Sequence, residues 1–127
     1  PGVNIGLFCS TPMVALSRNV PRKRAMEMLL LGELISADEA AQYGLVNKAV
    51  AKENVMEEAM VYARRILAKS PATVAIGKEA FYHQIEQPLS EAYDYAVGVM
   101  VQNMLYRDAE EGIGAFLEKR KPEWKGC

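Results

Sequence analysis

The sequence lacks several features that would assign a function class at once. It has no run of about 18 apolar residues, so we expect no membrane-spanning helix. Its 15 basic and 16 acidic residues are interspersed and give a formal net charge of −1, which provides no basic field for nucleic acid. The two cysteines, Cys9 and Cys127, lie near opposite ends, so we expect no disulfide scaffold and a reducing compartment.

Signatures of common catalytic sites are also missing. The sequence contains no metal-ligand cluster, P-loop, G-x-G-x-x-G motif or internal repeat. The one histidine, His83, has no serine, cysteine or carboxylate at catalytic spacing, so we interpret it as an ordinary polar or half-buried residue. Cys9 precedes a predicted helix and could be a reactive thiol, but we interpret it as a small buried hydrophobe.

The length and the hydrophobic content of the chain are sufficient for the core of one domain. Half of the 127 residues are hydrophobic. Because the chain begins at Pro1, without a methionine or a leader pattern, we expect it to be a fragment or a processed piece of a longer protein.

The clearest local signals lie in residues 25–50. An almost entirely apolar helix should end at Gly32 in a left-handed conformation. Ser36 and Glu39 form an S-x-x-E capping box for a second short helix that runs to Gly44. Leu45, Val46, Ala49 and Val50, which follow Gly44, predict a brief strand at residues 45–50.

The rest of the chain reads mainly as helix. Residues 1–11 predict an extended segment with turns. Five further helices are expected, and their predicted starts are Thr11 with Pro12, Asn54 with Glu57, Ser70 with Pro71, Ser90, and Asp108 with Glu111. The last should end at residues 119–121, before Pro122.

The central segment resembles the enoyl-CoA hydratase/isomerase (crotonase) superfamily, whose members carry A-x-E-x-x-L-x-G-x-x-I-S-A-x-E-A-x-x-x-G-L-V. The terminal EGIGAFLEKRKPEW is similar to that family's C-terminal pattern. The matching central residues are Ala25, Glu27, Leu30, Gly32, Ile35, Ser36, Ala37, Glu39, Ala40, Gly44, Leu45 and Val46.

The resemblance implies a fold and a division of the chain. It implies the C-terminal helical part of a crotonase α/β fold, here mainly α with one or two short strands. Residues 1–50 would end the crotonase core, and residues 51–127 would form the helical trimerisation and lid region.

The resemblance also implies a substrate pocket. Residues 1–6 correspond to a family P-E-x-x-x-G segment, and Gly2 stands where hydratases carry a glutamate used in adding or removing water. Glycine has no proton to exchange. The variant GLFCSTP at residues 6–12 resembles a subgroup that also lacks this glutamate. The implied pocket residues are Gly2, Leu7, Phe8 and Ser10.

Coenzyme A binding is implied at Lys119, where a family lysine reaches the nucleotide of coenzyme A on a neighbouring subunit. Met100 stands where some relatives place an aromatic residue against the adenine. A cation near a helix C-terminus is explained equally by the helix dipole. The basic residues 22–24 fit a solvated turn better than a phosphate-binding patch.

The implied function is part of an acyl-CoA-binding, enoyl-CoA hydratase-like lyase of fatty acid metabolism that stabilises a thioester enolate. Gly2 counts against a standard two-glutamate hydratase and leaves isomerase, thioesterase-like or weak hydratase activity, or none, open. It needs no metal or cofactor beyond the coenzyme A thioester substrate. A homotrimer or hexamer is implied, without nucleic acid or membrane partners, in the cytoplasm of a bacterium or the mitochondrial matrix of a eukaryote. The chain alone is expected to be inactive, because the family's oxyanion amides lie in segments that it does not contain.

The alternative function of this chain is not catalytic. The broad apolar stripe at residues 92–105 would suit a helical oligomerisation or interaction module.

Overall fold

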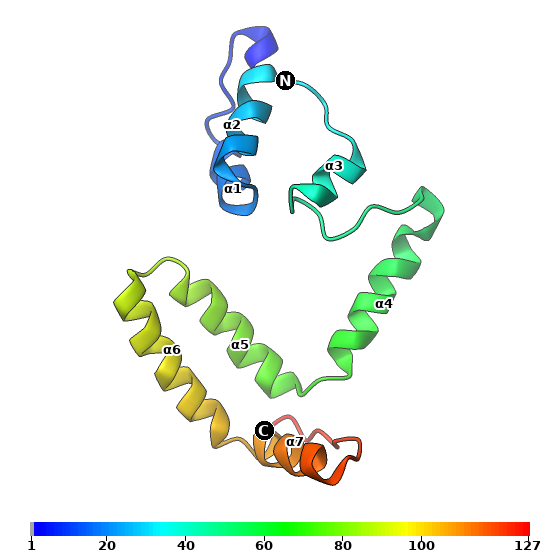
Figure 1. The fold of residues 1–127 in the computed structure, drawn as a ribbon, viewed down its shortest axis with the longest axis vertical. Helices are drawn as coiled ribbons and strands as arrows, with labels where there is room; N and C mark the ends of the chain where they lie inside the picture. Colours follow the sequence, from blue (N-terminus) through cyan, green and yellow to red (C-terminus); the bar gives the residue numbers. More distant parts are fainter. Residues whose placement is uncertain (1) are drawn as a thin grey trace. The chain divides into compact units, whose positions relative to one another are not determined.

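The computed structural model describes residues Gly2 to Cys127 (Figure 1). Internal contacts divide the chain into two units, one ending at Val55 and the other comprising Met56–Cys127. The described residues form helices only, without a strand. These helices are η1 (Gly2–Ile5), α1 (Pro12–Asn19), α2 (Arg22–Leu31), α3 (Ala37–Gln42), η2 (Lys52–Asn54), α4 (Val55–Leu67), α5 (Pro71–Gln84), α6 (Leu89–Met104) and α7 (Arg107–Glu118).

In the first unit, α1 and α2 lie side by side, and η1 packs at the end of α2 (Figure 1). Gly32 ends α2 with φ 63°, as predicted. The Asn4 side chain donates to the Gly32 carbonyl oxygen at 3.1 Å, and a Cβ on Gly32 would lie 2.7 Å from Val3 Cγ1. Glycine is therefore required here both by its left-handed backbone and by the close approach of η1.

The predicted capping box of α3 is confirmed. The Glu39 N–H donates to Ser36 Oγ at 3.2 Å, and the Ser36 N–H donates to Glu39 Oε2 at 2.8 Å. The strand predicted at residues 45–50 is wrong for the described chain. The N–H groups of Leu45 and Val46 instead donate to the Ala40 carbonyl at 2.9 and 3.3 Å, closing the C-terminus of α3. A strand needs a neighbouring strand to satisfy its backbone groups, and residues 2–127 provide none.

The extended segment predicted at residues 1–11 is also corrected, although Pro1 lies outside the described residues. Residues 2–5 form the short helix η1, and Gly6 follows with φ 77°. The Leu7 N–H then donates to the Gly2 carbonyl at 3.0 Å, so the chain folds back on itself. The left-handed glycine converts the apolar segment into a closed turn.

In the second unit, α5 and α6 form an antiparallel pair, and both contact α7 (Figure 1). Its buried residues include Ser70, Ala92, Asp108 and Ala115. Ser70 caps α5 as predicted, accepting the Thr73 N–H at 3.1 Å. Ser90 does not cap α6, because that helix already begins at Leu89 after Pro88.

The predicted capping box at the start of α7 is wrong as well. The N-cap is Tyr106, so Asp108 lies inside the first turn. Asp108 and Glu111 instead bind the C-terminal segment, residues 119–127.

None of the described helices is long and apolar enough to cross a membrane.

Candidate functional site

The four predicted pocket residues lie within one short segment of the first unit, residues 2–10. The Gly2 carbonyl accepts the Leu7 N–H at 3.0 Å, and the Ser10 hydroxyl donates to the Phe8 carbonyl at 3.2 Å. The side chains of Leu7 and Phe8 are 63% and 44% exposed. The structure therefore brings these residues together as an exposed apolar loop beside a glycine.

Gly2 has no room for a side chain in this conformation. A Cβ built on it would lie 2.6 Å from Cys9 Sγ and 2.9 Å from the Leu7 carbonyl oxygen. Both distances are shorter than the van der Waals contact of carbon with sulfur or oxygen. Cys9 is half-buried, so its thiol is not the fully buried hydrophobe that the sequence suggested.

The two predicted coenzyme A residues lie on α6 and at the end of α7. Met100 is exposed on α6. Lys119 follows the last helical residue, Glu118, with φ 56°, and its N–H donates to the Phe116 carbonyl at 3.3 Å. Residues 119–121 therefore lie beyond the helix, not in its last turn.

Next to Lys119, Arg120 fixes the C-terminal segment against α7. Its guanidinium donates to the two carboxylate oxygens of Glu111 at 2.6 and 2.9 Å and to Glu118 at 2.6 Å. The Glu123 N–H adds a hydrogen bond to Glu111 at 2.8 Å. The Arg120 hydrogen bonds, with that of the Glu123 N–H, lower the pKa of Glu111 from 4.5 to about 2.

A second anchor of this segment is Asp108, which is only 2% exposed. Its carboxylate accepts the Lys125 N–H at 2.7 Å and the Gly126 N–H at 3.0 Å, while its own N–H donates to the Cys127 carbonyl at 2.9 Å. A hydrogen bond from the Ser70 side chain, then those from the backbone, hold the pKa of Asp108 below its ordinary value.

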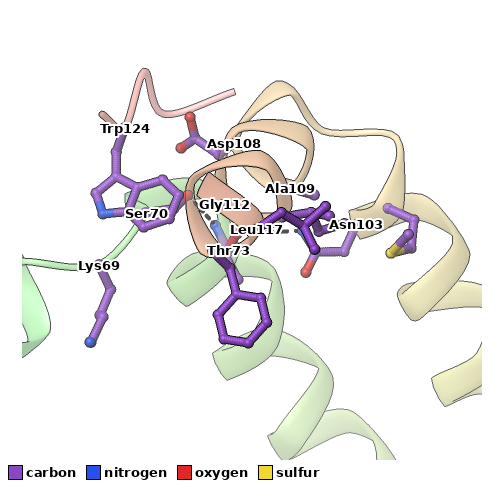
Figure 2. Close-up of a pocket in the computed structure, with 12 residues that line it drawn as sticks. Lys69, Ser70, Thr73, Asn103, Asp108, Ala109, Gly112, Leu117 and Trp124 are labelled. Carbon is purple, nitrogen blue, oxygen red and sulfur yellow. Dashed lines mark hydrogen bonds between the residues drawn. The ribbon is translucent and has the colours of Figure 1, made fainter. Parts of the chain in front are cut away.

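A largely apolar pocket of about 480 Å³ is lined by the start of α5, the end of α6, one face of α7 and Trp124 (Figure 2). The Trp124 indole forms part of its wall and donates to the Ala68 carbonyl at 2.9 Å. Neither Met100 nor Lys119 lines this cavity. The lining residues are Lys69, Ser70, Thr73, Asn103, Met104, Asp108, Ala109, Gly112, Ile113, Phe116, Leu117 and Trp124.

The roles of Asp108, Glu111, Arg120 and Trp124 were not found from the sequence. The acidic pair fitted a capping box, and the basic run fitted the helix dipole. The available signal was the single tryptophan after Pro122, since an aromatic residue beyond a helix end needs an apolar surface to cover it.

Other candidate groups have local partners. A ring nitrogen of His83 lies 3.0 Å from the Gln87 amide nitrogen, and its ring contacts that of Tyr95. Arg24 pairs with Glu27 at 2.6 Å and lies over the ring of Tyr43. Among residues 2–127, no group of three or more histidine, cysteine, aspartate or glutamate side chains is arranged to hold a metal.

The apolar stripe of α6 is exposed. Within the predicted residues 92–105, Ala92 is buried, and the large apolar side chains that are exposed are Tyr93, Val97, Met100, Val101, Met104 and Leu105.

Comparison with known proteins places these features in a family. The sequence model of enoyl-CoA hydratase/isomerase matches residues 1–127. The chain is 54% identical to rat mitochondrial enoyl-CoA hydratase domain-containing protein 3 over 124 residues, covering 98% of this chain and 41% of the rat protein. It is 33% identical over 118 residues to carnitinyl-CoA dehydratase of Salmonella typhi, covering 90% of this chain and 45% of that protein.

Solved structures give the same result. An enoyl-CoA hydratase of Mycobacterium smegmatis has a TM-score of 0.90 at 54% identity, covering 97% of this chain and 48% of that one. Human enoyl-CoA hydratase domain-containing protein 3 has a TM-score of 0.87 at 54% identity, with 98% and 49% covered. The subgroup that residues 6–12 resemble is that of enoyl-CoA hydratase domain-containing protein 3, and its members are among these similar proteins. The chain spans less than half the length of the relatives named here. The chain belongs to the enoyl-CoA hydratase/isomerase family.

Proposed function

We propose that this chain is the acyl-CoA-binding C-terminal part of an enzyme that polarises a thioester carbonyl with two backbone amides and stabilises the resulting enolate. The proposal that this enzyme differs from a standard hydratase rests on residue 2. This residue is glycine, and the position that its Cβ would take is filled by Cys9 Sγ and the Leu7 carbonyl oxygen. A group for general acid–base catalysis at this position is absent. The enzyme is therefore enoyl-CoA hydratase-like in fold and substrate but not a standard two-glutamate hydratase.

We assign Gly2, Leu7, Phe8 and Ser10 to the acyl-thioester pocket, supported by the Gly2–Leu7 turn and the exposure of the two apolar side chains. Lys119 would contact the phosphates of coenzyme A. Among residues 2–127, Lys119 forms no ion pair that would compete with such a contact. Met100 would contribute an apolar surface to the adenine.

The complete protein would be a homotrimer or hexamer. In this arrangement residues 1–50 complete the catalytic core, and residues 51–127 form the oligomer contacts and the lid. The exposed stripe of α6 supports such contacts. Relatives named as mitochondrial proteins support a mitochondrial location if the source is a eukaryote. Within that location we propose the matrix and a role in fatty acid metabolism, and the cytoplasm would apply to a bacterium.

The test is an acyl-CoA binding and turnover screen on the complete protein that carries this chain. We expect saturable binding of acyl-CoA and weak or absent hydration of crotonyl-CoA, with isomerase and thioesterase substrates included. The 127-residue chain alone should show no turnover. Hydration of crotonyl-CoA by the pure chain would contradict the proposal.

The contribution of Lys119 is tested separately. Lys119→Ala should weaken coenzyme A binding more at low salt than at high salt, because a phosphate contact is screened by ions. Unchanged affinity at both salt concentrations would exclude Lys119 from the site.

A second candidate function is a non-catalytic helical oligomerisation module, favoured by the exposed stripe of α6. It predicts a defined helical oligomer without acyl-CoA affinity. Sedimentation of the complete protein, combined with the binding screen, separates the two functions.

A further inference from the structure

We infer that Cys9 is a specificity-determining residue: its thiol and the Leu7 carbonyl together occupy the space in which a side chain at residue 2 would begin. The steric contact is a property of the turn itself. Its catalytic consequence rests on the proposed function, because only that function gives residue 2 a place beside the thioester.

The turn that brings these groups together is fixed at several points. The Leu7 N–H donates to the Gly2 carbonyl at 3.0 Å, and the Gly6 N–H donates to the Val3 carbonyl at 3.2 Å. On the other side, the Cys9 carbonyl accepts the Met13 N–H at 3.0 Å, which ties Cys9 to the start of α1. Cys9 therefore cannot move away from Gly2 as a whole without breaking helix and turn hydrogen bonds.

The two contacts differ in how they can be relieved. The sulfur, 2.6 Å from the ideal Cβ position, belongs to a side chain that can rotate. The Leu7 oxygen, 2.9 Å from the same point, belongs to the backbone and moves only with the turn. A side chain at residue 2 therefore displaces the thiol first, and removal of the sulfur should relieve part of the strain but not all of it.

The consequence for chemistry is the exclusion of a carboxylate from this point. An aspartate or glutamate at residue 2 would have to share the space of Cβ with the thiol, so restoring the acid–base group needs a change at Cys9 as well. The site is consequently specialised for reactions that need carbonyl polarisation without delivery of water from residue 2.

The experiment is a double-mutant cycle in the complete protein, with Gly2→Ala, Cys9→Ala and the double variant. Gly2→Ala should lower the melting temperature by roughly 5 °C, from overpacking, and the double variant should lose less than the two single variants together. Labelling of Cys9 by a maleimide, read by peptide mass spectrometry, should become several-fold faster in Gly2→Ala because the thiol is displaced. Gly77→Ala, with no atom within 4 Å of its Cβ, is the matched control and should not lower the melting temperature.

Equal losses with and without the Cys9 sulfur, or unchanged stability and labelling in Gly2→Ala, would overturn the inference. Neither readout uses acyl-CoA. A protein that shows the coupling but binds no acyl-CoA would therefore contradict the proposed function alone.

Discussion

Lys119 has a left-handed backbone at the end of α7, where glycine is the usual residue. A lysine is strained in this backbone conformation because of its Cβ, whereas a glycine would not be. Lys119→Gly should therefore stabilise the complete protein by about 1 kcal/mol, whereas Lys119→Ala should retain the strain. Urea unfolding of the two variants measures the difference, and both should lose coenzyme A affinity if the ammonium group binds it. Equal stability of the two variants would show that the backbone relaxes at this residue.

Asp108 is buried, and its two carboxylate oxygens accept hydrogen bonds from the backbone N–H groups of Lys125 and Gly126 in the C-terminal segment. Asp108→Ala leaves the N–H groups of Lys125 and Gly126 without their partner. We expect a fall in melting temperature of roughly 5–10 °C, from the loss of two hydrogen bonds to a charged acceptor. The control is Asp94→Ala on the exposed side of α6, which should change the melting temperature little. A similar loss in both variants would argue against an anchoring role.

At the scale of the element, α7 offers two glycines in different surroundings. A Cβ on Gly112 would lie 3.2 Å from the Trp124 ring, whereas a Cβ on Gly114 would meet nothing within 4 Å. Gly114→Ala should stabilise the protein by about 0.5–1 kcal/mol through helix propensity. Gly112→Ala should lose that gain because the indole must shift. Unfolding followed by tryptophan fluorescence measures both, and an equal gain at the two positions would mean that the indole moves without cost.

The docking of the C-terminal segment onto α7 predicts a pH dependence. The pKa of Glu111 is about 2 in the folded protein, below its ordinary 4.5. Its ion pair with Arg120 therefore contributes fully above about pH 4.5 and is lost as the pH falls through 2. Arg120→Gln should lower the melting temperature at pH 7, and the difference from the wild type should shrink steadily between pH 4.5 and 2.

Arg65→Gln is the matched control, because it removes the same charge from an exposed position of α4. Its difference from the wild type should stay nearly constant over this pH range. A constant difference for Arg120→Gln as well would show that Glu111 is not the titrating partner.

At the scale of the whole molecule, the chain exposes more surface than self-contained folds do. Its accessible area is 10279 Å². Two separate compact domains sharing this mass would expose only roughly 8,000 Å² together. Large apolar side chains are exposed on several helices, including α4, which buries none of its residues, and the stripe of α6. These faces require partner surfaces, which fits the proposed place of the chain in a larger protein.

The corresponding prediction concerns the 127-residue chain in isolation. It should bind a hydrophobic dye and self-associate, and Val97→Glu in the exposed stripe should lower dye binding without loss of helicity. Gln102→Glu adds the same charge to α6 outside the stripe and should have little effect. Dye fluorescence with circular dichroism measures this, and an equal response to both changes would exclude the stripe as the exposed patch.

The sequence by itself determined the helix ends that depend on nearest neighbours. Gly32, the Ser36–Glu39 box and the Ser70 cap were all predictable because each acts within about one helical turn. Family membership was predictable for a similar reason, since the motif that carries it is continuous along the chain.

Tertiary structure alone decided the rest. Residues 45–50 have strand-forming side chains, but a strand exists only where a partner backbone pairs with it. Asp108 and Glu111 have the spacing of a capping box, yet their carboxylates bind backbone groups and Arg120 up to 18 residues further along the chain. The contact of Cys9 with the vacant side of Gly2 likewise depends on a turn closed by Gly6. Local pattern fixes local hydrogen bonds, whereas the partner of a polar or apolar group remote in sequence is set only when the chain has packed.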